Sequence, residues 1–163
     1  MIVEVVLLFP LMIAMVFGVL EFGWWVNAHM VTANAASQAA RSVALTGRIS
    51  SATVPDQIEA IAKGGGLDTK ELRWTATATT ADGGVVTSSG NLPSTATTTQ
   101  CIYEGPGGFS PGTIKVTVNY TYQLLFPPLG TPMFLDLGNA LPKAITATST
   151  VPLEEEWSAG PTC

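Results

Sequence analysis

The sequence predicts an α+β fold, in which a long N-terminal hydrophobic α-helix packs on an antiparallel β-sheet. Two observations lead to this prediction. Apolar residues are concentrated in the first 45 of the 163 residues, where they run without the breaks that turns require. After about residue 67 the pattern changes to a period of two, with threonine at the alternating polar positions. We therefore expect two parts: a helix over residues 1–47 and a globular α+β domain over residues 48–163.

The first half of the predicted helix has the length and composition of a membrane span. Residues 5–26 contain one formal charge, Glu21, and as a helix they extend about 30 Å. Pro10 is expected to kink or loosen this helix because it lacks an N–H. Gly18 and Gly23 are small enough to let another helix approach closely.

The stretch Glu21-Phe22-Gly23-Trp24-Trp25 resembles an interfacial belt, in which indoles lie at the headgroup level of a membrane. The alternative is that the two indoles pack against the body of the protein.

Glu4 is an isolated carboxylate in an apolar run, with no Lys or Arg before Arg41. Such a group needs a partner or protonation. The nearest candidate cation is a free α-amino group, either its own or that of a neighbouring subunit; the alternative is a solvated Glu4 at the membrane surface. No basic segment and no small-residue cleavage site of a secretory signal precede it, so we expect Met1 to lie at or near a processed N-terminus.

The second half of the helix, residues 27–45, is amphipathic. Val31, Ala35, Ala39 and Val43 recur every four residues and predict a small-residue face that lies closely on a sheet. Thr46-Gly47 is typical of a helix end. A shorter helix is predicted over residues 54–63, with Thr53 as its cap, and it ends at Gly64-Gly65-Gly66. That triplet lacks the spacing of a phosphate-binding loop and predicts a hinge or turn.

Four or five antiparallel strands are predicted after residue 67. The strongest is residues 113–125, whose alternation implies one face on the core and one in water. Residues 82–84 predict a hairpin turn and residues 90–94 a loop, while residues 133–141 fit either a short helix or a surface loop. The other predicted strands are residues 71–79, 85–88, 96–103 and 145–151.

Two cysteines, Cys101 and Cys163, predict a single disulfide in an exported domain, with two buried free thiols as the alternative. The single histidine, His29, leaves no zinc-binding set. The acidic run at residues 154–156 is expected to be solvated surface rather than a cation site.

Composition excludes several classes of function. The formal net charge is −5 and 12% of residues are charged, so the basic surface that nucleic-acid binding needs is missing. No nucleophile elbow, phosphate loop or catalytic set of side chains is present in the pattern. We predict neither an enzyme nor a cofactor.

Four short stretches together resemble a known family. They are Val3-Glu4 with the run to Pro10, the segment from Gly18 to Gly23, Asn34-Ala35-Ala36, and Ala39-Ala40-Arg41. This N-terminal part resembles the TadE-like pilins and pseudopilins of the tight adherence (Tad) branch of the type IV pilus superfamily. Residues 114–120, 125–128 and 145–150 are similar more loosely to the late strands and the proline-containing loop of that family.

The resemblance implies a pilin-like fold and two successive locations, the inner membrane and then an extracellular filament. A prepilin peptidase would remove a short leader, the subunit would wait in the inner membrane, and an ATPase-driven assembly platform would extrude it into an extracellular helical filament of identical subunits used for adhesion. Glu4 would pair with the N-terminal amine of an adjacent subunit, although family glutamates usually stand fifth in the mature chain. A minor pseudopilin and a single-pass membrane-anchored binding domain are the alternatives.

Overall fold

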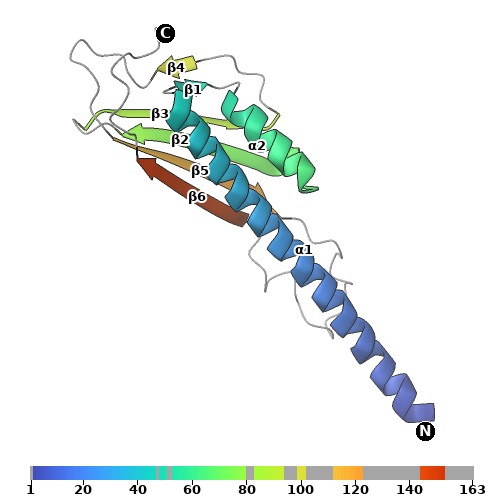
Figure 1. Ribbon diagram of the computed structural model, residues 1–163. Helices are drawn as coiled ribbons and strands as arrows, with labels where there is room; N and C mark the ends of the chain where they lie inside the picture. The colour runs from blue at the N-terminus through green and yellow to red at the C-terminus, as the bar shows by residue number, and fades with distance from the viewer. Residues whose placement is uncertain are drawn as a thin grey trace.

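The computed structural model describes residues 2–46, 48–50, 53–79, 83–93, 99–101, 112–122 and 144–152. One long helix, α1 (Ile2–Thr46), lies across one face of a four-stranded antiparallel sheet and extends far beyond it (Figure 1). The α+β fold predicted from the sequence is confirmed. The other elements are β1 (Arg48–Ser50), α2 (Thr53–Gly64), the 3₁₀ helix η1 (Thr69–Glu71), β2 (Leu72–Thr79), β3 (Val85–Asn91), β4 (Thr99–Cys101), β5 (Thr113–Thr121) and β6 (Ala144–Pro152).

Helix α1 has 45 residues and continues through Pro10, so its axis is about 67 Å long. Its C-terminal half buries a row of small side chains on β5 and β6, as the four-residue spacing predicted. Small side chains let the helix backbone approach the sheet closely, which leaves little space unfilled. The buried residues of this row are Ala28, Thr32, Ala35, Ala36, Ala39, Ala40 and Val43.

The sheet has the strand order β3-β2-β5-β6, and every neighbouring pair is antiparallel. Its inner face packs against α1, while its outer face carries mainly threonines, so the predicted alternation is confirmed. Among the residues that the structure describes, Trp74 is the largest fully buried side chain. The inner-face residues of the central strands are Leu72, Trp74, Ala76, Ala78, Ile114, Val116, Val118 and Tyr120.

Several strand bounds differ from the prediction. β3 continues to Asn91, although residues 90–94 were predicted to be a loop. Of residues 96–103, the structure describes residues 99–101, and this strand pairs with β1 in a separate two-stranded sheet. β1 has three residues, too few to show a period, and was not predicted. β5 ends at Thr121, four residues before the predicted end. Residues 133–141 and 154–156 lie outside the described ranges.

Helix α2 packs on α1 and ends in the predicted glycine turn. It begins at Thr53 itself, which was predicted to be its cap. At its end, Leu67 N–H donates to Ala62 O (2.9 Å) and Gly66 N–H to Lys63 O (3.1 Å), the pattern of a Schellman motif. Gly66 has a φ of +76°, a conformation that glycine adopts without strain.

Gly65 brings the two helices into direct contact. A Cβ atom at this position would lie 2.6 Å from Cγ1 of Val31 on α1, which is closer than real side chains approach. Asn27 of α1 donates a hydrogen bond from Nδ2 to the Gly65 carbonyl oxygen (3.1 Å). The glycine triplet therefore serves as a turn and also as a close packing site for α1.

Candidate assembly surface and its anchor to the domain

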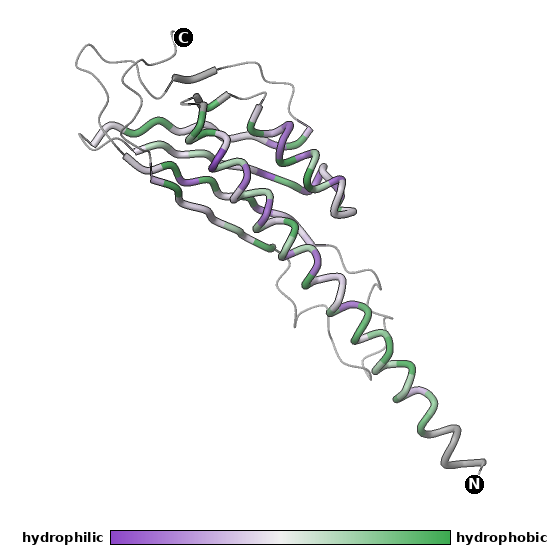
Figure 2. Tube along the Cα trace, viewed as in Figure 1, coloured by the Kyte–Doolittle hydropathy of each residue, from purple (hydrophilic) through white to green (hydrophobic). Residues whose placement is uncertain are grey.

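The N-terminal part of α1 extends away from the globular domain and is apolar. We call residues 8–20 the apolar segment. In Figure 2 this part of α1 is coloured almost continuously as hydrophobic, whereas the helices of the domain also carry hydrophilic residues. Its large apolar side chains are exposed, Met15 to 73%. They are Leu8, Phe9, Leu11, Met12, Ile13, Met15, Val16, Phe17, Val19 and Leu20.

These exposed side chains cover the whole circumference of the helix. Successive residues of an α-helix are about 100° apart, and residues 8–13 alone are all exposed. An amphipathic surface helix would instead turn one apolar stripe to its own domain. The apolar segment therefore needs an apolar environment on all sides, which a lipid bilayer or a bundle of neighbouring helices provides.

By length and composition, α1 is the one helix in the described part of the chain that is apolar enough to cross a membrane. The candidate span begins at Leu8, the first residue whose side chain is described, and lies near the N-terminus. The helix backbone is described from Ile2. From Ile2 to Leu20 the helix is about 28 Å long, close to the thickness of a hydrocarbon core.

Gly18 and Gly23 are positions at which this helix offers a bare backbone. Apart from the helix itself, no atom in the described part of the structure lies within 4 Å of where a Cβ would stand at either glycine. Gly18 is one turn from Ala14, and small residues four apart favour close helix–helix contact. Pro10 is exposed in the same segment. Within the described ranges, these positions are open to another helix.

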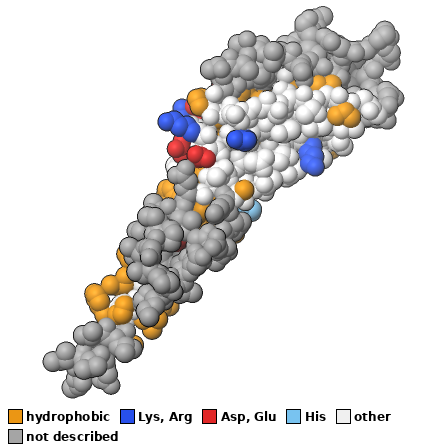
Figure 3. Space-filling view, turned by 180° about the vertical axis from the view of Figure 1, so that it is seen from behind, with side chains coloured by type: hydrophobic (Ala, Val, Ile, Leu, Met, Phe, Trp, Pro, Cys, Tyr) orange, Lys and Arg blue, Asp and Glu red, His pale blue; other side chains and the backbone are white. Residues whose placement is uncertain are grey.

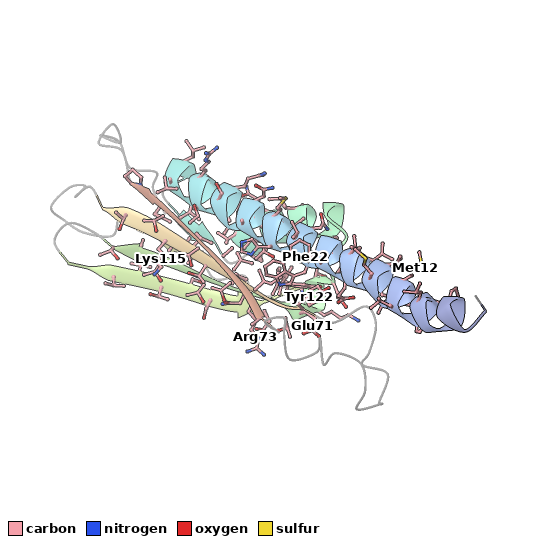
Figure 4. The ribbon with its side chains drawn as sticks, turned by 90° about the horizontal axis from the view of Figure 1, so that it is seen from below. Met12, Phe22, Glu71, Arg73, Lys115 and Tyr122 are labelled. Atoms are coloured by element: carbon pink, nitrogen blue, oxygen red, sulfur yellow. The ribbon has the colours of Figure 1, made fainter. Side chains whose placement is uncertain are left out.

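Glu21 marks the point where the apolar segment meets the domain. Its side chain is 5% exposed, although the residues before and after it are exposed. The Tyr122 hydroxyl donates to Glu21 Oε1 (2.7 Å) and lies 3.4 Å from the Glu21 carbonyl oxygen. Figure 4 shows Tyr122 turned toward α1, near Phe22. This pair joins the helix to the residue that directly follows β5.

The pair has a marked electrostatic effect on the tyrosine. Burial raises the pKa of Tyr122, and the hydrogen bond to Glu21 and the charge of that carboxylate raise it further. The hydroxyl therefore stays protonated and acts as a donor throughout the physiological pH range. Burial also raises the pKa of the neighbouring Tyr120. A charge-assisted hydrogen bond of this length, sheltered from water, fixes where the domain is attached along α1.

The two tryptophans after Glu21 lie in different environments. Trp24 is 38% exposed, beside the glycine turn of α2. Trp25 is half-buried against the hydrophobic core and stacks between Phe22 (6.0 Å) and His29 (5.9 Å). Trp25 thus packs on the body of the protein, while Trp24 faces outward at the end of the domain where α1 leaves it. His29 is on the exposed side of the helix.

Three of the predicted site residues lie outside what the structure describes. The backbone of Glu4 belongs to α1, but its side chain is not described. The same holds for Cys101, whose strand β4 pairs with β1, and Cys163 lies beyond the last described residue. The amine pairing of Glu4 and the disulfide stay predictions.

Among the described side chains, no group of three or more His, Cys, Asp or Glu residues gathers as a metal site would require. The arrangement offers apolar contact and close backbone approach. These are the means by which helices associate.

Sequence reasoning missed the partners that hold α1 in place. Tyr122 lies within the strand predicted over residues 113–125, but its hydrogen bond to Glu21 joins residues 101 positions apart, and no local sequence pattern predicts it. No partner was predicted for Asn27, which binds the Gly65 carbonyl oxygen. The signal for Glu21 was its isolation in an apolar run, which requires a buried partner.

Comparison with known proteins supports the resemblance. A family model described as TadE-like protein matches residues 1–41. The match covers the part of α1 that carries the apolar segment, Glu21 and the start of the small-residue face, and the similarity predicted from these residues is confirmed. A search of curated proteins returned no match. A search of solved structures returned none either.

Proposed function

We propose that this chain, whose first 41 residues are TadE-like, is a structural subunit of an extracellular type IV-like (Tad) pilus that polymerises through its N-terminal helix. The family match and the apolar helix together indicate a protein associated with the Tad pilus and anchored by an N-terminal membrane helix. The proposal adds the filament stage, in which the apolar segment leaves the bilayer and enters a bundle of identical helices. Adhesion or surface attachment is the role of such a filament.

One observation carries the proposal: the apolar segment is exposed around its whole circumference, next to bare backbone at Gly18 and Gly23. Both environments of a pilin satisfy such a segment, first lipid and then neighbouring helices. Helices that meet through different faces form a heterologous contact, which builds a filament when the rotation between successive copies does not close into a ring. Residues 1–47 would form the filament core and residues 48–163 the outer domain.

The proposed partners follow from this pathway. They are a prepilin peptidase at the inner membrane, an inner-membrane assembly platform, and further copies of the same chain. No cofactor or catalytic role is proposed. The alternative function, a minor pseudopilin or a single-pass anchored domain, uses the same helix but places few or no copies in a filament.

Glu4→Ala separates these functions. If Glu4 pairs with the N-terminal amine of a neighbouring subunit, the substitution leaves that amine without its carboxylate, and the yield of filaments is expected to fall at least about tenfold. The domain should keep its melting temperature, because Glu4 lies more than four helical turns from Glu21. Glu4→Gln is the matched control for the charge. Normal filaments from the alanine variant would refute the pairing.

The proposed function itself is tested by electron microscopy of filaments sheared from the producing cells, with mass spectrometry of their subunits. We expect this chain to be the dominant component. If filaments form without it and the chain stays in the membrane fraction, it is an anchored domain or a minor component instead.

A further inference from the structure

The face of the sheet opposite α1 is not used by the proposed filament contacts. It is built by the odd-numbered residues of β2, β3 and β5 and the even-numbered residues of β6, and we call it the outer face. The strand registers place these side chains on one side, since Arg73 stands opposite both Asn91 and Asn119, and Asn119 opposite Thr146. Each of them is exposed or half-exposed.

The outer face is an ordered array of hydroxyl groups. Threonine is its most frequent residue, and the side chains bond to one another across the strands. Thr146 Oγ1 donates to Asn119 Oδ1 (2.7 Å), the hydroxyls of Thr117 and Thr148 are 3.2 Å apart, and Thr87 donates to Thr77 (3.5 Å). Because a hydroxyl has one donor and two acceptor sites, each keeps capacity for a ligand.

This order favours binding. Threonine is restricted at χ1, and the cross-strand bonds hold the hydroxyls further, so little rotamer freedom is left to lose when a ligand binds. Neighbouring rows are about 4.8 Å apart across the strands and about 7 Å apart along them. A polymer with hydroxyl groups at regular intervals matches such an array better than a small molecule does.

The charge on this face is opposite in sign to that of the whole chain. The chain carries a formal net charge of −5, yet the charged side chains of the outer face are Arg73 and Lys115, both exposed cations. Lys115 stands opposite Thr77, which lies four residues along β2 from Arg73. The two cations are therefore on adjacent strands and about 14 Å apart along the strand direction. Figure 3 shows separate blue patches on a largely white surface, with red gathered at one end.

Other partners fit this face less well. A protein interface needs apolar anchors near its centre, whereas Val85, Ala144 and Pro152 stand at the ends of the edge strands. Nucleic acid needs stacking aromatics or a denser basic surface. The bilayer is ruled out by orientation, because the strands run at a small angle to α1 and the face lies alongside the helix axis (Figure 1).

We propose that the outer face binds an acidic polysaccharide, with Arg73 and Lys115 contacting its carboxylates and the threonine rows its hydroxyls. Figure 4 shows Arg73 on the side of the sheet away from α1, free to reach such a polymer. The inference goes beyond the filament proposal and does not depend on it, because the face belongs to a single globular domain.

The test measures binding of the full-length chain, in detergent, to immobilised polygalacturonate and to neutral dextran. We expect binding to the acidic polymer alone, weaker at higher salt, and weakened about tenfold or more by Arg73→Gln with Lys115→Gln. The matched control, Arg41→Gln on the exposed side of α1, should bind as the unchanged chain does. Circular dichroism verifies that each variant is folded.

A second pair of variants tests the hydroxyl array. Thr117→Val with Thr148→Val keeps the shape and removes two hydroxyls, and about a threefold loss is expected. Equal affinity after this change, equal binding to dextran, or equal competition by polyphosphate or oligothymidine would overturn the assignment to an acidic polysaccharide. So would an Arg41→Gln variant that loses as much affinity as the outer-face variant.

Discussion

Replacing Tyr122 by Phe is expected to lower the free energy of unfolding by about 2–3 kcal/mol. The substitution removes only the hydroxyl that donates to Glu21 Oε1 and keeps the ring in place. The carboxylate stays 5% exposed and loses a charge-assisted donor, which is costly because water does not reach it. Chemical denaturation of the full-length chain in detergent measures the loss, with Thr121→Val on the outer face as a control for hydroxyl removal.

A double-mutant cycle with Glu21→Gln distinguishes the pair from general packing. If the hydrogen bond carries the effect, the two losses are not additive and the double variant is more stable than their sum predicts. Replacing both partners at once removes the buried charge together with its donor, which costs less than breaking the pair. Additive losses would show that the Tyr122 hydroxyl acts independently of the Glu21 side chain, as it would through the Glu21 carbonyl oxygen 3.4 Å away.

The same variant has a signature at alkaline pH. The folded-state pKa of Tyr122 is raised above its ordinary value of 10.0, so the folded chain holds this proton more tightly than the unfolded chain does. The resulting stability is complete below about pH 10 and is lost as pH rises above it. Tyr122→Phe should therefore lose less stability than the unchanged chain between pH 10 and 12. Because the pKa of Tyr120 is also raised, part of the loss of stability with rising pH remains in both the unchanged chain and Tyr122→Phe.

The elements with a strong period were predictable from sequence. The spacing of Ala35, Ala39 and Val43 predicted the face of α1 that packs on the sheet, and the alternation from residue 113 predicted the inner and outer faces of β5. In both cases one repeating contact with the core determines many residues at once, so the local pattern records the tertiary environment.

Gly90 shows why the bounds of β3 were wrong. Glycine is a poor strand residue and was read as the start of a loop. In the structure the Trp74 indole occupies the space beside it, with Nε1 only 3.0 Å from where a Cβ would stand. Gly90 lies in β3 because the Trp74 side chain of the neighbouring strand occupies the space that a side chain at position 90 would need. The local sequence around Gly90 does not contain this information. The Glu21–Tyr122 pair was unpredictable for the same reason.

Gly65→Ala is expected to destabilise the fold by about 3 kcal/mol. Its Cβ would overlap the side chain of Val31, which is β-branched and restricted to few rotamers in a helix, so neither side yields easily. Separating the helices would also lengthen or break the hydrogen bond from Asn27 to the Gly65 carbonyl oxygen. Denaturant titration should show a lower midpoint with α2 detached first in hydrogen exchange.

Two further variants test whether the contact itself is responsible. Gly64→Ala is the matched control, because no atom described in the structure lies within 4 Å of a Cβ there, and it should cost little or nothing. Val31→Ala combined with Gly65→Ala opens the space that the new methyl group needs and should be more stable than Gly65→Ala alone. If Gly64→Ala destabilises the fold as much as Gly65→Ala, or if Val31→Ala restores no stability, the destabilisation arises in the turn and not in the packing of α2 on α1. In that case the position of α2 depends on the Schellman motif at Gly66, and the helix pair tolerates a wider separation than its contacts indicate.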